Sequence, residues 1–325
     1  MPNKLRAVRA AVKCAVSRAK ACAIIFVLLL SHSPTLQADP AMTTGSMYGA
    51  FGPEGQRMRE QLWLLPSGDN SIALRATVFR PASTLTQRFP LVVINHGTSE
   101  ASRLSVSMPV YYWLSRWFVD RGYAVVLPQR RGHGSTGGEL VESVGSCADP
   151  DHFQSGLTAA DDIGAAVDYM THQPFVDPTR ILVVGVSTGG WASLALAAKR
   201  PDLVSAVVNF AGGRGGHAWG RSNSVCGVDK LVIAAHDFAR TARAPTLWLY
   251  ASNDSYFGPA LAAKMAAAWK DGGGLVEYDP LPDYGRDGHT IADDRAGWDL
   301  WGSNLERFLA SNFAPSKEPQ VAQGP

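Results

Sequence analysis

The feature that most constrains the fold is a regular alternation of short apolar segments with longer segments of helical spacing. Branched apolar residues predict strands at seven places: residues 72–79, 91–95, 123–127, 181–185, 204–210, 246–251 and 275–278. Apolar residues recur with helical spacing between most of them: 110–120, 157–171, 191–199, 229–242, 259–271 and 296–312. Strands that are apolar on both faces and alternate with helices are typical of a mostly parallel sheet covered on both sides. We therefore expect an α/β fold.

The start of the chain has a different pattern. Residues 1–20 carry basic residues and no acidic one, residues 21–30 (ACAIIFVLLL) are apolar, and Leu36-Gln37-Ala38 ends in a small residue. This order is typical of a signal peptide, and the apolar stretch is too short for the ~20 residues that span a bilayer. We predict that residues 1–38 are removed on export to the periplasm or the medium, which leaves no stable membrane anchor.

The remaining chain divides into three parts by composition. Residues 39–60 are mixed and polar and predict an irregular N-terminal arm. Residues 61–314 contain the alternating pattern, which predicts one α/β domain, and residues 315–325 predict a disordered tail. Residues 130–155 and 212–227 are the longest connections inside the domain, and long loops in a compact domain are usually functional.

Charge and cysteine content also depend on the export signal. The chain has 30 basic and 28 acidic residues, and six of the basic ones lie in residues 1–38, so 24 basic face 28 acidic residues after export. No basic patch then argues for nucleic acid. Cys147 and Cys226 are the two cysteines left, and an oxidising compartment makes them a disulfide candidate, the alternative being two free thiols.

A single serine stands between glycines where a predicted buried strand becomes a helix. The stretch ILVVGVSTGGWAS contains Gly185-Val186-Ser187-Thr188-Gly189, a G-x-S-x-G sequence. In this context the glycines allow a sharp turn that holds the serine oxygen clear of the sheet, as in a nucleophile elbow. Ser187 is therefore the expected nucleophile; the alternative is an ordinary turn with a capping serine.

A serine nucleophile needs a base, and the base needs a carboxylate to orient it. His289 follows the last predicted strand on a loop before the final helix, which is the position expected for the base, whereas His236 lies in an apolar helical segment and is expected to be structural. Asp254 follows the strand 246–251 and is the expected acid. Asp287 competes with it, but would have to fold back on its own loop.

Attack on a carbonyl also creates an oxyanion that needs fixed N–H donors. We expect the backbone N–H groups of Thr98 and Thr188, one after the strand 91–95 and one after the nucleophile. Aromatic residues near these positions suggest an apolar pocket suited to a hydrophobic or aromatic ester. The expected wall residues are Trp191, His217, Trp219, Tyr256 and Phe257, for each of which a place in the ordinary core is the alternative.

Several motifs together resemble one known superfamily. The stretches LVVINHG, QRRGHGSTGG, VDPTRILVVGVSTGGWAS, LWLYASNDSYFGP and DGHT resemble the α/β-hydrolase superfamily, in particular its dienelactone-hydrolase and prolyl-oligopeptidase-like branch. The resemblance covers residues 72–313. It implies an eight-stranded, mostly parallel sheet with helices on both faces, loops that build a cap, and activity on esters, lactones or peptides.

Other classes of protein fit the sequence less well. Gly132, Gly134 and Gly137 spell the G-x-G-x-x-G of a dinucleotide site, but no helix opens directly behind them. Metal-binding motifs are lacking, and residues 149–152 suggest a solvated loop. We therefore expect no cofactor and no metal, and a small-molecule ester as substrate. A small serine peptidase and a catalytically silent binding protein with the same fold remain as alternatives.

Overall fold

The computed structural model describes residues 47–82, 87–98, 100–108 and 111–313. The predicted signal peptide, residues 39–46 of the predicted arm and the predicted tail lie outside these residues. The described parts form one compact unit. No helix among them is both long enough and apolar enough to cross a membrane.

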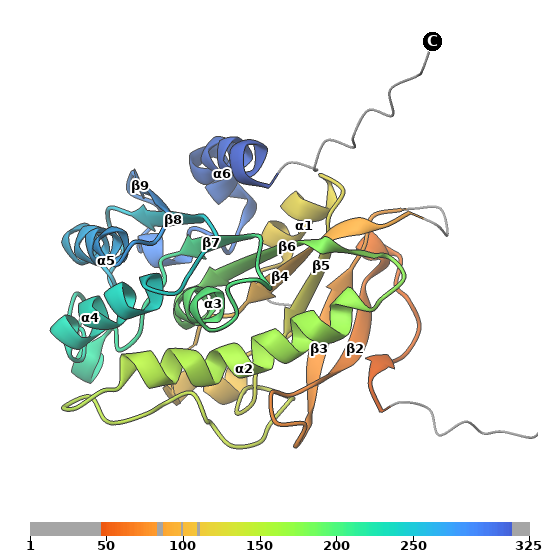
Figure 1. Ribbon diagram of the computed structural model, residues 1–325, viewed down its shortest axis with the longest axis horizontal. Coiled ribbons are helices and arrows are strands. Elements are labelled where there is room, and N and C mark those ends of the chain that lie inside the picture. The colour runs from red at the N-terminus through yellow and green to blue at the C-terminus, as the bar shows by residue number, and fades with distance from the viewer. Residues whose placement is uncertain (1–46, 83–86, 99, 109–110, 314–325) are drawn as a thin grey trace, which may run out of the picture. The chain divides into compact units, whose positions relative to one another are not determined.

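A single sheet of nine strands forms the centre of this unit (Figure 1). The strands are β1 (Gly49–Ala50), β2 (Gln61–Pro66), β3 (Ala73–Phe79), β4 (Phe89–Asn95), β5 (Ala124–Pro128), β6 (Val176–Val186), β7 (Ala206–Phe210), β8 (Thr246–Ala251) and β9 (Val276–Leu281). Their order in the sheet is β1-β2-β3-β5-β4-β6-β7-β8-β9. Neighbouring strands run antiparallel from β1 to β5 and parallel from β5 to β9. The mostly parallel sheet is therefore confirmed.

The strand count differs from the eight expected, because the predicted arm contributes to the sheet. Gly49 and Ala50 form β1, which pairs antiparallel with β2, so residues 47–60 are not wholly irregular. Residues 57–59 form a short 3₁₀ helix between these two strands. Strand β2 was not among the seven segments read from the sequence either. Its side chains alternate between buried and half-buried, which is the pattern of a strand near a sheet edge rather than of a fully buried one.

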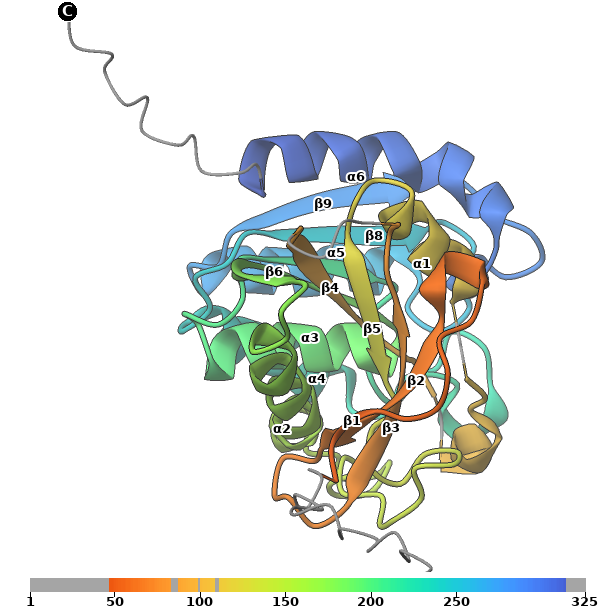
Figure 2. The same cartoon turned by 90° about the vertical axis from the view of Figure 1, so that its right-hand side faces the viewer.

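Six α-helices cover the two faces of the sheet (Figures 1 and 2). They are α1 (Tyr112–Val119), α2 (His152–Thr171), α3 (Thr188–Lys199), α4 (Val228–Ala239), α5 (Pro259–Asp271) and α6 (Trp298–Asn312). Helices α1 and α6 pack on one face and α2 to α5 on the other. Strand β4 shows why two cores form: Leu91 and Val93 point to one face and Val92 to the opposite one, since successive side chains alternate along a strand.

The connections at the carboxyl ends of the strands position the site. Strands β4, β6, β7, β8 and β9 are parallel, so the loops that follow them begin at the same edge of the sheet. Ligands of open parallel sheets bind at this edge. The long loops 129–151 and 211–227 also begin there, after β5 and β7, and a disulfide between Cys147 and Cys226 joins them.

Candidate active site

Ser187 lies at the turn between β6 and α3 in a backbone conformation that side-chain-bearing residues rarely adopt. Its φ is 55° and its ψ is −123°. A Cβ atom at Gly185 would lie 2.2 Å from the Gly189 carbonyl oxygen, and one at Gly189 would lie 2.1 Å from the Asn95 carbonyl oxygen. These positions admit glycine because β6, α3 and β4 approach one another so closely here. The structure thus has the sharp strand-to-helix turn that the sequence predicted around Ser187.

His289 and Asp254 are in direct contact. His289 belongs to a 3₁₀ turn, Gly288–Thr290, after β9, and its Nδ1 lies 3.1 Å from both carboxylate oxygens of Asp254. The Asp254 side chain is fully buried, and its Oδ1 also accepts the backbone N–H groups of Tyr256 and Phe257 at 2.7 and 3.0 Å. A carboxylate fixed in this way holds the imidazole in one orientation and one tautomer, with Nδ1 protonated.

The competing carboxylate, Asp287, bonds to its own loop. Its Oδ1 accepts the backbone N–H groups of Ser255 and His289 at 3.1 and 3.0 Å, and its Oδ2 accepts the Ser255 hydroxyl. Burial acts to raise the pKa of Asp287, but these hydrogen bonds outweigh it and lower the pKa. Asp287 therefore joins the loop after β8 to the loop after β9 and contacts the backbone of His289 rather than its ring.

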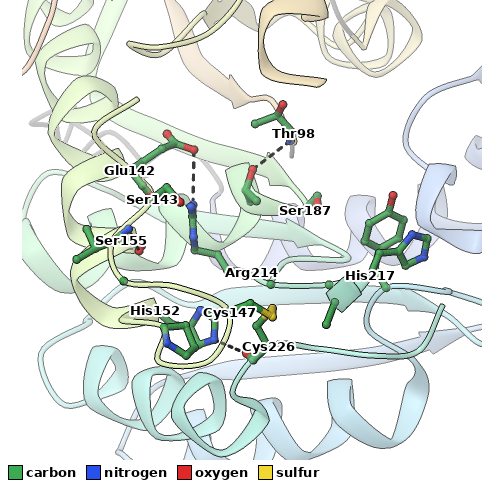
Figure 3. A pocket seen from close by; sticks show the side chains of 18 of the residues that line it. Thr98, Glu142, Ser143, Cys147, His152, Ser155, Ser187, Arg214, His217 and Cys226 are labelled. Atoms are coloured by element: carbon green, nitrogen blue, oxygen red, sulfur yellow. Dashed lines mark hydrogen bonds and ion pairs between the residues drawn. A yellow bond between two sulfur atoms is a disulfide. The ribbon is translucent and has the colours of Figure 1, made fainter. Parts of the chain in front are cut away.

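Of the two expected oxyanion donors, Thr98 lies beside Ser187 (Figure 3), and Thr188 follows Ser187 in the chain. Gly97 and Thr98 follow β4, and a Cβ atom at Gly97 would lie 2.7 Å from the Ser187 Cβ, so this loop passes directly over the nucleophile. The Thr98 N–H donates to the Thr188 Oγ1 at 3.1 Å. An oxyanion bound by the Thr98 N–H would take the place of this hydroxyl.

A cavity of about 380 Å³ opens next to Ser187. Four of the five predicted wall residues line it: His217, Trp219, Tyr256 and Phe257. The prediction for Trp191 was wrong. Trp191 is fully buried in the core, packs at a tilt against Phe238 and donates its indole N–H to the His152 carbonyl, because α3 is apolar on all sides and is covered on all sides.

Tyr256 connects this cavity with His289. Its ring centroid lies 3.6 Å from that of His217, with the planes 9° apart, and 4.1 Å from that of His289, with the planes 23° apart. The rings of His217 and His289 are both nearly parallel to the Tyr256 ring. At these distances they must lie on its opposite faces, because on the same face they would clash with each other. Burial raises the pKa of Tyr256, which keeps the phenol neutral. The ring is thus packed between the two histidines.

The sequence did not reveal a group of buried charged residues at the wall of the cavity. Arg130 is fully buried and donates from Nε and Nη2 to the Glu142 carboxylate at 2.6 and 3.2 Å. Arg214 contacts the same residue: its Nη1 lies 3.5 Å from Oε1, and its Nη2 donates to the Glu142 carbonyl. Burial acts to raise the pKa of Glu142, but the two guanidinium groups hold it well below its ordinary value. Charge in a glycine-rich loop was visible in the sequence, but its burial was not.

The disulfide lies at the other end of the cavity. Cys147 and Cys226 line it together with His152, whose Nε2 contacts the Cys226 carbonyl at 2.7 Å. The expectation of a solvated loop was therefore wrong for His152, which is buried as the first residue of α2. His236 lies on α4, as predicted, and its half-buried ring contacts Asp237.

We expect removal of this disulfide to destabilise the protein. The bridge closes a loop of 79 residues, which is worth about 4 kcal/mol in the chain-entropy account of cross-links. Cys147→Ser/Cys226→Ser should lower the free energy of unfolding by an amount of this order, measured by urea denaturation beside the oxidised wild type. Non-reducing peptide mapping that finds both thiols free in protein produced in an oxidising compartment would contradict the bridge itself.

No group of three or more His, Cys, Asp or Glu side chains in the described part of the chain is arranged to hold a metal ion. The dinucleotide-like glycines also have a local explanation. Gly134 lies in the loop after β5, where a Cβ atom would be 2.2 Å from the Val106 carbonyl oxygen, and α2 begins only at His152. Close packing thus accounts for a glycine at this position.

Comparison with known proteins finds one family match and several distant relatives. The Prolyl oligopeptidase family matches residues 109–213. Dipeptidyl-peptidase 5 from Porphyromonas gingivalis is 27% identical over 157 residues, 47% of this chain, and the chain spans only 21% of that protein. Probable acetylxylan esterase A from Aspergillus flavus is 24% identical over 264 residues, 75% of this chain and 80% of the esterase.

Solved structures agree with this result. A putative dienelactone hydrolase from Klebsiella pneumoniae superposes with a TM-score of 0.52 at 18% identity, over 78% of this chain and 98% of that protein. The matches confirm the resemblance to the α/β-hydrolase superfamily and to its prolyl-oligopeptidase and dienelactone-hydrolase branch. The protein is thus similar to hydrolases that include both esterases and peptidases.

Proposed function

We propose that this protein is a serine hydrolase that cleaves carboxylic esters through an acyl-enzyme. The observation that carries the proposal is the position of Ser187 at a sharp strand-to-helix turn together with the contact between His289 and Asp254. Both features are needed for serine catalysis, whereas a protein that only binds a ligand needs neither. The esterase that matches three quarters of the chain supports an ester as the substrate.

The proposed mechanism follows from the position of each group. Asp254 accepts a hydrogen bond from the Nδ1–H of His289, which leaves the unprotonated Nε2 as the base that takes the Ser187 proton during attack on the ester carbonyl. The Thr98 and Thr188 N–H groups would bind the oxyanion. His289 then protonates the leaving alcohol, and water releases the acid from Ser187. No hydrogen bond joins Ser187 to His289 among the described residues, so this contact forms when substrate binds.

A serine peptidase of the prolyl-oligopeptidase type is the second candidate, because that family matches the segment that contains Ser187. The same acyl-enzyme chemistry would then act on an amide. A panel of nitrophenyl esters beside dipeptide anilides separates the two. We expect kcat/KM to be higher for the esters; the reverse order would assign the protein to the peptidases.

We also propose that the enzyme is exported. The basic and apolar segments of residues 1–38 support this, and so does the disulfide, which persists in oxidising compartments. Protein recovered from the periplasm or the medium should begin at Asp39. Recovery of the full-length chain from the cytoplasm alone would reject export.

The proposed nucleophile is tested directly by a fluorophosphonate, which forms a stable ester with an activated serine. We expect one label per folded molecule, mapped to Ser187 by peptide sequencing, and competition by nitrophenyl esters. Ser193 is a suitable internal control, since it is fully buried on α3 and hydrogen-bonds the Gly189 carbonyl. Folded protein that takes up no label at Ser187 would exclude serine catalysis and leave the catalytically silent binding protein.

A further inference from the structure

The cavity extends from Ser187 away from His289. Its wall contains Ser187, Thr98 and Thr188, and continues to Arg214 and the disulfide, but neither His289 nor Asp254 is among its described lining residues. Tyr256 does line it, and its ring stacks on His289. Figure 3 shows Arg214 and Glu142 on one side of Ser187 and His217 on the other.

If the serine chemistry proposed above holds, the position of the cavity relative to Ser187 and His289 determines which half of an ester enters it. In the tetrahedral intermediate the leaving oxygen must face the histidine that protonates it, and the oxyanion must face the N–H donors. The acyl chain takes the remaining direction from the reacting carbon. A cavity that includes the nucleophile and the oxyanion donors but not His289 therefore accepts the acyl half.

The wall of the acyl cavity contains a guanidinium group in a largely buried position. The Arg214 side chain is 12% exposed, and Glu142, which holds it, is itself held by the fully buried Arg130. Two guanidinium groups thus share the single carboxylate of Glu142. Transfer of such charges from water into the protein costs desolvation free energy, so a buried ion pair is weak evidence for a role in stability alone.

Beside its apolar residues, this wall carries several further polar groups. The hydroxyl residues Ser143, Ser146 and Ser155 line it. His133 lines it as well, with Nδ1 bonded to the Arg131 carbonyl and Nε2 buried 3.9 Å from Glu142 Oε1. Burial, helped by Arg130, lowers the pKa of His133 to about 4, so the ring is neutral at pH 7 and adds no charge.

We propose that this cavity binds the acyl half of the substrate and that Arg214 selects acyl groups that carry a carboxylate. A guanidinium binds a carboxylate through two parallel, charge-assisted hydrogen bonds, which neutral oxygen groups do not match. Glu142 is not expected to bind an ammonium group of a substrate, because Arg130 and Arg214 already surround its carboxylate. The preferred substrates are half-esters of dicarboxylic acids.

The test uses four nitrophenyl esters that share a six-carbon acyl chain and differ at its far end: hexanoate, hydroxyhexanoate, aminohexanoate and the adipate half-ester. We expect kcat/KM of the wild type to be at least about tenfold higher for the adipate half-ester than for the other three. In Arg214→Met this ratio should fall to about one, and Arg214→Lys should restore part of it. Arg221→Met, an exposed arginine of the same loop, is the matched control and should keep the wild-type ratio.

The outcomes separate this inference from the proposed function. A wild type that hydrolyses hexanoate but shows no preference for adipate overturns the inference and leaves the serine hydrolase intact, as does a preference for the aminohexanoate or the hydroxyhexanoate. Failure to hydrolyse all four esters, with no fluorophosphonate label on Ser187, overturns the proposed function itself. The wild-type series decides the matter even where Arg214→Met fails to fold.

Discussion

His289→Ala should lower kcat for a nitrophenyl ester by about 10⁶-fold, the size of effect seen when the base of a serine triad is removed. The substitution deletes the ring whose Nδ1 lies 3.1 Å from both carboxylate oxygens of Asp254. Without it, the Ser187 hydroxyl has no group to take its proton, and a neutral hydroxyl is a weak nucleophile. Steady-state turnover of the purified variant measures the loss.

His236→Ala is the matched control, because His236 lies half-buried on α4 and contacts Asp237. It should retain wild-type turnover. Both variants need melting curves, since His289→Ala also leaves the buried Asp254 carboxylate with one partner fewer. A His289→Ala enzyme that folds and keeps more than about a hundredth of wild-type turnover would show that another residue is the base.

The sequence predicted the parts of the site that depend on strand ends. A buried strand is recognisable from its branched residues, and the residue that follows it emerges at the active edge of the sheet. This reasoning located Ser187 after β6 and Asp254 after β8, and it placed Thr98 after β4. Chain order then selected His289 from the histidines that follow Ser187, and the structure brings it into contact with Asp254.

The sequence predicted less well what depends on packing between distant segments. Trp191 is an aromatic residue close to Ser187 in the sequence, which suggested a place in the pocket wall. Helix α3 is enclosed on all sides, however, and a helical segment with few polar residues does not reveal which of its sides faces a cavity. Arg130 and Glu142 belong to the loop 129–151 and Arg214 to the loop 211–227, so their burial against one another follows only from the fold. Strand β1 has two residues, too few for any periodic pattern.

The acid of the proposed triad is tested by two substitutions that differ only in which carboxylate is amidated. Asp254→Asn should lower kcat by about 10⁴-fold, the size reported for an amidated triad aspartate. The amide places an N–H donor against His289, which favours the tautomer protonated at Nε2, and that tautomer cannot accept the Ser187 proton. The backbone N–H groups of Tyr256 and Phe257 keep their acceptor, because the amide oxygen can stay where Oδ1 is now.

Asp287→Asn should lower kcat by only about tenfold or less, an expectation that rests on the hydrogen bonds it would retain. Its amide oxygen can still accept the N–H groups of Ser255 and His289, and its NH₂ group can donate to the Ser255 hydroxyl oxygen, which now donates to Oδ2. The loop that carries His289 thus keeps its anchor without the charge. Turnover of the two variants, each with an unchanged melting temperature, decides the assignment: a larger loss for Asp287→Asn would mean that Asp287 rather than Asp254 orients His289 during catalysis.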